Sequence, residues 1–479
     1  MGNKPLIKLF KTREKFYFFD TNKNTIVDIT SKQYQAIEKY IDSNSESSIA
    51  LEAINNMREE GYLSSNRVKE IVSSVDEVFQ FYLENNVEMI ILQVTQQCNF
   101  RCEYCIYSGS YYNRTHSSKR MDFETAKRAI DFLIRHSKNH DRIGINFYGG
   151  EPLIEFDLVK KCIEYAEEKC EGKIVQFYMT TNGYLLNDEV VEFLFKHHVH
   201  ITISLDGPKE IHDGHRKLAF NDGGTFDKVY ENIVNIQKNF NNYMFFISFN
   251  TVIDTKNNFF TIDEFFKNNE VIRNLDSRIT SISESDSKKP LKVSDTFYIN
   301  REYEVFREMY YLVRKHTNKS RSKITKNACD SITGLHERLK PENRLPEKSH
   351  PRGSCIVGSK RLFISADGMF YPCEKCNEAS DLLRIGDLDN GFDTEQVRKL
   401  INIGKISEDE CKNCWAINHC TICPAVLNSS DNEFTTEAKM EMCKKVRMEV
   451  EENLKNYCVL KEFGYAFKSA EENMNLISN

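Results

Sequence analysis

Between residues 86 and 290 the sequence alternates between short apolar runs and longer amphipathic stretches. The apolar runs are rich in branched residues, which is typical of strands, and the intervening stretches repeat apolar residues at helical spacing. Such strand–helix units build a parallel sheet of about six strands, either doubly wound or a partial (β/α)6 barrel similar to a TIM barrel. The expected strands are Met89–Thr95, Ile143–Phe147, Val175–Thr180, His200–Ser204, Tyr243–Val252 and Arg278–Ile282. In such sheets the reactive residues gather at the C-terminal ends of the strands.

Other patterns flank this alternating unit. Residues 1–85 begin with three short strands followed by helices, which predicts a winged-helix-like domain, and Val68–Glu84 is expected to form an amphipathic helix. We expect a helical bridge and linker over 291–350, a cysteine-rich domain over 351–460 and a tail over 461–479. The alternating unit would be the α/β core of this chain.

The charge pattern limits the partners of the chain. Lys and Arg number 65 and Asp and Glu number 71, so the formal net charge is -6, with both signs mixed along the sequence. No large basic field is present to attract nucleic acid, and no apolar run is long enough to span a bilayer. We therefore expect a cytoplasmic protein that has neither a nucleic-acid nor a membrane partner.

The 15 cysteines are the strongest chemical signal. Thiols stay reduced in a large cytosolic chain, so clustered cysteines bind metal or do redox chemistry more often than they form disulfides. Cys98, Cys102 and Cys105 form a CxxxCxxC loop directly after the first expected strand. Three thiolates suit one cubic iron–sulfur cluster and leave one of its four irons open, whereas a closed electron-transfer cluster uses four thiolates. A three-cysteine zinc site with a borrowed fourth ligand is the alternative.

A second motif makes this loop more specific. Gly149, Gly150 and Glu151 open a GGEP turn after the second expected strand. Together with the CxxxCxxC loop, this turn resembles the radical S-adenosylmethionine (SAM) superfamily. The resemblance implies that the open iron chelates the amino and carboxylate groups of SAM, that the glycine-rich turn hydrogen-bonds the amino group, and that Glu151 supplies a compensating negative charge. A GGEP sequence can equally be an ordinary tight turn, in which glycine lets the backbone approach closely.

Further site residues follow from the same resemblance. Ser204 ends the fourth strand, and Asp206 and Arg216 follow it as in relatives similar to sulfatase maturases. The resemblance implies that Ser204 and Arg216 contact the carboxylate and ribose region of SAM. Asp206 is a candidate base, although Asp before Gly is also a common turn residue. The resemblance further assigns to the adenosine pocket Tyr104, Asn182 and Val252.

The second group of cysteines resembles the SPASM domain, an extension of radical SAM enzymes that holds two auxiliary four-iron clusters. The chain departs from the family pattern at Cys420-x-x-Cys423, where CxxxC is usual. The resemblance implies one cluster held by Cys411, Cys414, Cys420 and Cys443. It implies another held by Cys355, Cys373 and Cys423, with Cys376 or Cys329 as the fourth ligand or with an open iron. Paired CxxC knuckles also hold zinc, but the five residues between Cys414 and Cys420 are fewer than zinc ribbons use.

The resemblance implies a reaction as well. The three [4Fe-4S] clusters and SAM would generate a 5'-deoxyadenosyl radical, abstract hydrogen from an unactivated carbon and remove a second electron. The N-terminal strands and helices resemble the leader-binding element of enzymes that mature ribosomal peptides, which capture a peptide as an added strand. Nearly the whole chain thus resembles sactipeptide or ranthipeptide synthases, which form thioether bonds. The expected partners are a cysteine-containing precursor peptide and an external electron donor such as flavodoxin or ferredoxin.

Three other readings stay open at this point. A sulfatase maturase, which oxidises cysteine or serine to formylglycine, shares the core and the SPASM pattern. Carbon–carbon crosslinking or epimerisation of a peptide would use the same clusters. A protein that senses redox state, or binds a partner, through iron–sulfur clusters would not be an enzyme at all.

Overall fold

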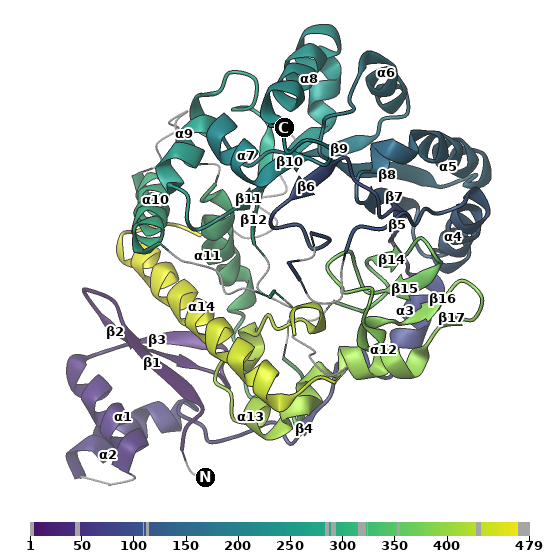
Figure 1. Ribbon diagram of the computed structural model, residues 1–479. Coiled ribbons are helices and arrows are strands. Elements are labelled where there is room, and N and C mark those ends of the chain that lie inside the picture. Colours follow the sequence, from purple (N-terminus) through teal and green to yellow (C-terminus); the bar gives the residue numbers. More distant parts are fainter. Residues whose placement is uncertain are drawn as a thin grey trace.

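The structure is a computed structural model that describes residues 4–43, 48–108, 110–111, 115–282, 287–288, 294–314, 322, 324–351, 355–427 and 433–467. Figure 1 shows a central arc of strands with helices outside it, an N-terminal module at one side, and the long helix α14 (Thr436–Glu462) beside that module. Among the described residues, no helix is both long enough and apolar enough to cross a membrane.

Six parallel strands form the core, as the alternating pattern predicts. The strand expected over Tyr243–Val252 begins only at Ile247, because Asn241–Phe246 form a 3-10 helix. In spatial order the six strands are β5 (Met89–Thr95), β7 (Arg142–Gly149), β8 (Ile174–Thr181), β9 (His200–Ser204), β11 (Ile247–Ile253) and β12 (Asp276–Ser281). The helices outside them are α4 (Phe123–His136), α5 (Phe156–Lys169), α6 (Asp188–Lys196), α8 (Phe226–Asn239) and α9 (Phe259–Asn268). Because β5 and β12 stand at opposite ends of this run, the six strands do not pair into a closed ring. The α/β class is confirmed, and the partial barrel stays an interpretation.

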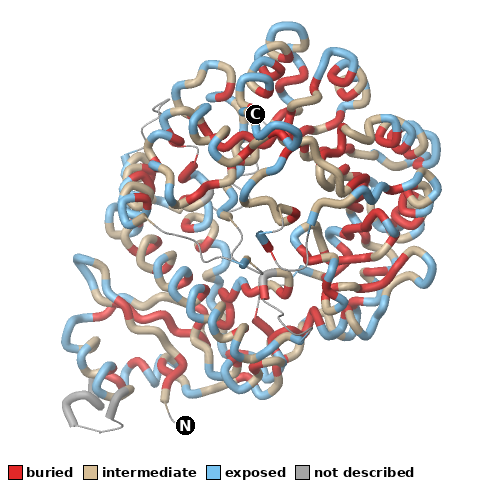
Figure 2. Tube along the Cα trace, viewed as in Figure 1, coloured by how far each residue is buried: buried red, intermediate tan, exposed pale blue. Residues whose placement is uncertain are grey.

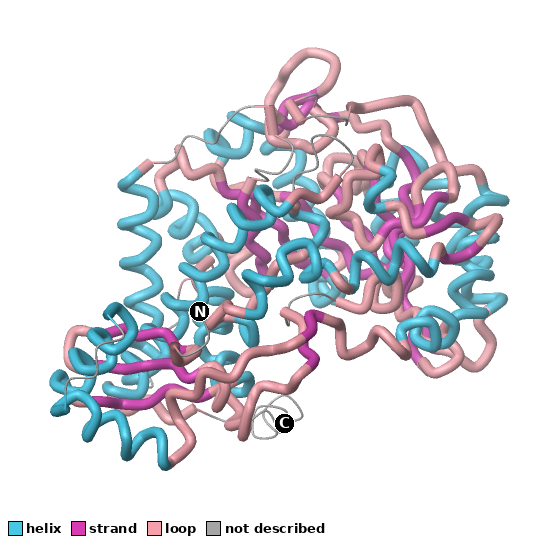
Figure 3. Tube along the Cα trace, turned by 90° about the horizontal axis from the view of Figure 1, so that it is seen from below, coloured by secondary structure: helices cyan, strands magenta, loops and turns pink. Residues whose placement is uncertain are grey.

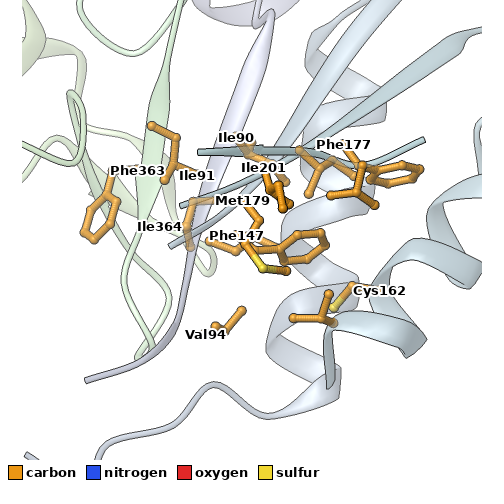
Figure 4. Close-up of a cluster of buried hydrophobic side chains, with 14 of the residues drawn as sticks. Ile90, Ile91, Val94, Phe147, Cys162, Phe177, Met179, Ile201, Phe363 and Ile364 are labelled. Atoms are coloured by element: carbon orange, nitrogen blue, oxygen red, sulfur yellow. The ribbon is translucent and has the colours of Figure 1, made fainter. Parts of the chain in front are cut away.

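Apolar side chains from neighbouring strands pack together beneath the helices. Figure 4 shows side chains of β5, β7, β8 and β9 meeting Cys162 of α5. The buried residues concentrate along these strands and the inner faces of the helices (Figure 2). Each large side chain buried here stabilises the fold by about 1.5–3 kcal/mol. Those exposed by 3% or less include Ile90, Phe147, Phe177, Met179 and Ile201.

The cysteine-rich segment continues the same sheet. Strand β14 (Leu362–Ile364) pairs in parallel with β5, on the side away from β7. Three further strands follow antiparallel: β15 (Met369–Tyr371), β16 (Gly386–Asp387) and β17 (Gly391–Phe392). One sheet of ten strands therefore crosses the boundary expected at residue 351, which places part of the cysteine-rich segment against the first strand of the core.

The N-terminal module combines a small antiparallel sheet with two helices. Its strands β1 (Ile7–Lys11), β2 (Phe16–Asp20) and β3 (Thr25–Ile29) lie in that order, followed by α1 (Ser31–Ser43) and α2 (Ser48–Glu59). Successive side chains of a strand point to opposite faces. Accordingly Phe18 belongs to the apolar cluster that includes Ile37 of α1, whereas Tyr17 and Phe19 belong to the cluster around α14. Figure 3 shows the module at one side of the molecule. The winged-helix likeness stays a prediction.

The helix predicted over Val68–Glu84 is wrong in its first half. Glu70–Ile71 form strand β4, which pairs in parallel with β13 (Lys348–Ser349) of the expected linker. Only its last part is helical, in α3 (Phe79–Asn85). The cause is nonlocal: the backbone N–H groups that a helix would use locally bond instead to the linker, as in Lys69 N–H to Glu347 O at 2.7 Å. Two helices, α10 (Asp295–Arg314) and α11 (Lys326–Arg338), lie within the range expected for the bridge, and the domain boundaries stay predictions.

Candidate functional site

The CxxxCxxC loop lies at the C-terminal end of β5, where a parallel sheet places its reactive groups. Its middle forms the short strand β6 (Phe100–Cys102), which pairs antiparallel with β10 (Arg216–Leu218) and sets Cys102 opposite Arg216. Two backbone N–H groups point at sulfur: Phe100 N–H to Cys98 Sγ at 3.3 Å and Tyr107 N–H to Cys105 Sγ at 3.4 Å. Donors aimed at sulfur favour the thiolate, which is the form that binds iron.

The three thiols of this loop act on one another electrostatically. Burial, opposed by Arg216 and aided by the thiol of Cys105, raises the pKa of Cys102 to about 12. Burial followed by Glu151, and to a lesser degree the other two thiols, raises the pKa of Cys98 as well. Free thiols in this position hold their protons, so a metal that binds them must displace those protons. Three soft thiols in one loop fit an iron–sulfur cluster with one open iron.

The GGEP turn at the end of β7 is pressed against this loop. A Cβ on Gly149, whose φ is +137°, would lie 2.1 Å from Thr95 O, and one on Gly150 would lie 2.0 Å from Gln97 O. The N–H of Gly150 donates to Thr95 O and the N–H of Glu151 to Gln97 O, both at 2.8 Å. The glycines are therefore required here because the turn holds the backbone just before Cys98.

The Glu151 carboxylate joins the ends of β7 and β8. It is fully buried and accepts hydrogen bonds from Leu153 N–H at 3.0 Å, Thr181 Oγ1 at 2.8 Å and Asn182 N–H at 2.7 Å. Burial raises its pKa to about 7, against the lowering effect of these three donors. These hydrogen bonds hold the ends of the two strands together. The role that the resemblance implies for Glu151, charge compensation for SAM, stays a prediction.

Asp206 is the centre of a second buried group. Its carboxylate accepts from Arg216 Nε at 2.9 Å and Nη2 at 3.2 Å, from Val252 N–H at 3.0 Å and from the hydroxyl of Tyr104. The Arg216 guanidinium also lies 5.4 Å from the centroid of the Tyr104 ring. Burial acts to raise the pKa of Asp206, but Arg216 outweighs it and holds that pKa below its usual value. The structure thus brings four predicted residues together, with Asp206 ionised and fully engaged.

The other two predicted contacts lie nearby. Asn182 Nδ2 donates to Asn99 Oδ1 at 2.7 Å and lies 3.9 Å from Cys98 Sγ, so it faces the cysteine loop. Ser204 is the last residue of β9, is 9% exposed and pairs in register with Asn250 of β11. Their roles towards SAM, like the base role of Asp206, stay predictions.

The structure gathers four of the C-terminal cysteines around one pocket. Cys411 lies on α13 (Glu408–Lys412), Cys443 on α14, and Cys414 and Cys420 in the loop between these helices. Burial, with the three other thiols as further causes, raises the pKa of Cys420 to about 12. This group, which we call the second auxiliary set, is the one that the resemblance assigns to one closed cluster.

Four other C-terminal cysteines form the first auxiliary set: Cys355, Cys373, Cys376 and Cys423. Cys355 and Cys376 both lie within electrostatic range of Cys373 and Cys423. The thiol of Cys376 also hydrogen-bonds Cys373, which lowers the pKa of Cys373. Cys329 instead packs in an apolar cluster with Ile332 and Leu335. Of the two candidates for the fourth ligand, Cys376 is therefore the one that lies with this set.

The alternative metal for these thiols is zinc. Sulfurs around one tetrahedral zinc ion lie within about 4 Å of one another, because each Zn–S bond is about 2.3 Å. Across the described parts of the chain, no three His, Cys, Asp or Glu side chains are placed to hold a single metal ion. The iron–sulfur clusters therefore stay a prediction from the cysteine motifs and their resemblance.

Sequence reasoning missed a bridge between the first cysteine loop and the first auxiliary set. Tyr107, two residues after Cys105, donates its hydroxyl to Glu378 Oε1 at 2.5 Å, and Gln93 Nε2 of β5 donates to the same oxygen at 2.9 Å. Glu378 lies two residues after Cys376. No local pattern could reveal this contact, because its partners are 271 residues apart.

The N-terminal module touches the second auxiliary set, which the sequence also did not indicate. Thr21 Oγ1 donates to Trp415 O at 2.8 Å, and Asn418 Nδ2 donates to Thr21 O at 3.0 Å. His419 Nε2 lies 3.0 Å from Asn24 Oδ1. The three C-terminal partners all lie between Cys414 and Cys420, so the turn after β2 holds the loop of this set.

Comparisons with known proteins agree with this geometry. Residues 92–267 match the family model of the radical SAM superfamily. The chain contains a radical SAM domain. Members of that superfamily bind SAM and a [4Fe-4S] cluster, and the matched segment includes the CxxxCxxC loop, the GGEP turn and the Asp206 group.

Proteins similar to this chain include a cyclopropyl synthase and an anaerobic sulfatase-maturating enzyme. Radical SAM cyclopropyl synthase TigE of Paramaledivibacter caminithermalis is 24% identical over 383 residues, which cover 77% of this chain and 75% of TigE. The cysteine-type anaerobic sulfatase-maturating enzyme of Clostridium novyi is 26% identical over 343 residues, 69% of this chain and 85% of that enzyme. The uncharacterized protein MJ0907 of Methanocaldococcus jannaschii is 36% identical over 129 residues, 27% of this chain and 42% of its own length.

The fold also matches solved structures. The structure of native anSMEcpe with bound AdoMet aligns with a TM-score of 0.57 at 19% identity, over 77% of this chain and 99% of that one. Native anSMEcpe with bound AdoMet and Cp18Cys peptide aligns with a TM-score of 0.55 at 18% identity, over 79% and 99%. At this identity the likeness concerns the fold.

Proposed function

We propose that this chain is a radical SAM enzyme that modifies a ribosomally synthesised precursor peptide by joining a cysteine sulfur to a carbon of another residue. The observation that carries the proposal is that the cysteines lie in three separate groups. Three lie at the C-terminal end of β5 inside the radical SAM domain, and two sets of four lie in the segment that continues the same sheet. A cluster with an open iron would cleave SAM and closed clusters would accept an electron, which fits an oxidative radical reaction.

SAM bound at the open iron of a cluster on Cys98, Cys102 and Cys105 would supply a 5'-deoxyadenosyl radical. The protein's own contribution is orientation and the exclusion of water. Arg216 is held by Asp206 and stacked on Tyr104, so its guanidinium has a fixed position beside Cys102. The GGEP turn and Glu151 fix the other side of the loop. This support keeps the loop in one geometry while ligand binds.

The two auxiliary sets account for the electrons. A thioether forms from a thiol and a C–H bond with the loss of two protons and two electrons. One proton and one electron leave together as the hydrogen atom that the radical takes, the thiol loses the other proton, and the remaining electron must leave the peptide. Clusters on the auxiliary sets would accept that electron, and an external flavodoxin or ferredoxin would supply the electron that SAM cleavage consumes.

The N-terminal module fits a peptide partner. Its sheet has β1 and β3 at its edges, and an exposed edge can take up a peptide as an added strand. Contacts of Thr21 and Asn24 connect this module to the loop of the second auxiliary set. A leader held there would place the following core of a cysteine-containing precursor peptide near the clusters, in the cytoplasm where thiols stay reduced.

A sulfatase-maturase-like oxidation to formylglycine is the second candidate, because the enzyme of Clostridium novyi is similar over 69% of this chain. Mass spectrometry of a precursor peptide after anaerobic incubation with the enzyme and SAM separates the two. A thioether product has lost two hydrogen atoms and kept its sulfur, and its cysteine no longer reacts with iodoacetamide. Loss of sulfur with a new aldehyde would contradict the thioether proposal. A product that has lost two hydrogens, retains a reactive thiol and carries no aldehyde would indicate carbon–carbon crosslinking, whereas an aldehyde with all thiols retained would indicate oxidation of a serine.

A further inference from the structure

Lys439 is an unusual residue beside the second auxiliary set. It lies in the first turn of α14 and is 1% exposed, which makes it one of the largest fully buried side chains of the protein. Its Nζ donates to Ser407 Oγ at 2.5 Å, to Cys411 Sγ at 3.2 Å and to Gly404 O at 3.4 Å. Within the described residues, no carboxylate pairs with this ammonium group.

A buried ammonium group without an anion is costly. Removing such a charge from water costs several kcal/mol unless an opposite charge compensates it. The neutral hydroxyl and carbonyl acceptors of Lys439 do not supply that charge. Cys411 does so once its sulfur is a thiolate, and a cubic cluster on four thiolates is anionic as a whole. The position of Lys439 is thus explained if the second auxiliary set holds an anionic cluster.

We infer that Lys439 is a positioning residue that raises the reduction potential of the iron–sulfur cluster bound by the second auxiliary set. Reduction adds one negative charge to a cluster, so a nearby fixed positive charge stabilises the reduced form. Net charge and hydrogen bonds to the sulfurs are among the factors that set cluster potentials. Burial keeps water and salt from screening this charge. The inference rests on the proposed auxiliary clusters, and not on which peptide bond they help to form.

Among the described residues, the cations that act on the thiols of the first auxiliary set are not buried. The cations that act on its thiols are Lys375 and Arg361, and both are exposed. The Arg361 guanidinium is also paired with Glu374 at 3.1 Å. At the second set, by contrast, Arg447 adds a further hydrogen bond to Cys414 beside the charge of Lys439. The cluster with the higher potential should therefore be the one on the second set, which makes it the end point for an electron that leaves the peptide.

The test is an anaerobic redox titration followed by electron paramagnetic resonance, combined with iron analysis. The full chain carries Cys98→Ala, Cys102→Ala and Cys105→Ala, so that only the auxiliary clusters contribute signals. In this background Lys439→Met should shift one of the two auxiliary steps to more negative potential. The expected size is at least a tenfold change in the reduced fraction at a fixed potential, or about 59 mV for one electron. Lys439→Arg keeps the positive charge, so its potential should stay close to that of the parent. The matched control Lys375→Met should shift the potential of the cluster on the first auxiliary set by a smaller amount.

Each other outcome also decides the question. Unchanged potentials in a Lys439→Met protein that keeps its iron would overturn the inference. If Lys439→Met loses about four irons, Lys439→Gln and Lys439→Arg are compared. If the Gln variant loses this iron and the Arg variant retains it, the positive charge of Lys439 is what the cluster requires. If the Arg variant loses the iron as well, the shape of the lysine side chain matters and its charge does not, which overturns the inference. A parent protein without auxiliary iron would refute the proposed clusters themselves, and that result is read directly from the iron content.

Discussion

The cysteine loop of the radical SAM domain and the second auxiliary set both place thiols beside a buried cation, but they use that cation differently. At the loop, the Arg216 guanidinium is neutralised by Asp206. At the second set, Lys439 reaches Cys411 with only neutral acceptors besides. At the loop, the charges of the cation and the carboxylate cancel. Its three thiols leave one iron of a cubic cluster open for an external ligand. The second set leaves a positive charge for a closed anionic cluster. Under the proposed function, the reaction starts at the loop, and the second auxiliary set stores an electron from the peptide.

The sharpest way to break this comparison is to remove one thiol from each region. Cys102→Ala should reduce SAM cleavage to background, because the cluster that binds SAM is lost. Cys411→Ala should leave SAM cleavage within a few-fold of the parent and stop product formation, since only electron removal is affected. Release of 5'-deoxyadenosine and the mass of the peptide measure the two steps separately. Full peptide turnover by the Cys411→Ala variant would refute an auxiliary role.

The ligand set of the first auxiliary cluster sharpens the comparison further. Cys376→Ala should lower the iron content by up to about four of about twelve irons per chain, because Cys376 lies with Cys373 and Cys423. Cys329→Ala is the matched control, since Cys329 is buried in an apolar cluster, and it should leave the iron content unchanged. Colorimetric iron and sulfide assays on reconstituted proteins give the answer. The reverse pattern would make Cys329 the ligand.

The balanced pair at the loop predicts a large stability effect. Asp206→Asn leaves the buried Arg216 without a counter-charge, which should destabilise the fold by about 3–5 kcal/mol. The control Glu103→Gln removes an exposed partner of His215 in the same region and should cost at most about 1 kcal/mol. Urea unfolding under anaerobic conditions measures both. If Asp206→Asn is as stable as the parent, cleaves SAM normally and yet forms no product, Asp206 is a base and not a support for Arg216.

The smallest effect concerns the pH dependence of Glu151. Its pKa is about 7 in the folded protein against an ordinary value of 4.5. Between these values the folded state keeps a proton that the unfolded state has lost, so stability falls as pH rises. The contribution is fully present below pH 4.5 and is lost as the pH passes 7, and it amounts to about 3 kcal/mol. The free energy of unfolding of the parent, relative to Glu151→Gln, should decrease by that amount across this window. A constant difference would show that the carboxylate stays ionised.

The fold was largely predictable wherever its signals were local. Apolar runs and helical spacing placed the six parallel strands, because strand and helix periods are short-range features. Val68–Glu84 was misassigned because β4 owes its conformation to β13, far along the chain. The continuation of the core sheet into β14 is equally nonlocal.

In the candidate site, too, local features could be predicted from the sequence and nonlocal ones could not. The cysteine motifs have fixed spacing and could be found, and the structure places Cys376 beside its set. Lys439 could not be found, because it is one of 65 Lys and Arg residues and only its burial distinguishes it. Thr21 and Glu378 likewise gain their meaning from partners that are distant in the sequence.

The measurement that tests the central claim most directly is the iron and sulfide content of the anaerobically reconstituted protein, combined with an assay for 5'-deoxyadenosine after reduction in the presence of SAM. We expect about twelve irons per chain, four for each cubic cluster, together with release of 5'-deoxyadenosine. Zinc in place of iron, or iron without any cleavage of SAM, would contradict radical chemistry and indicate a binding or structural role for these cysteines.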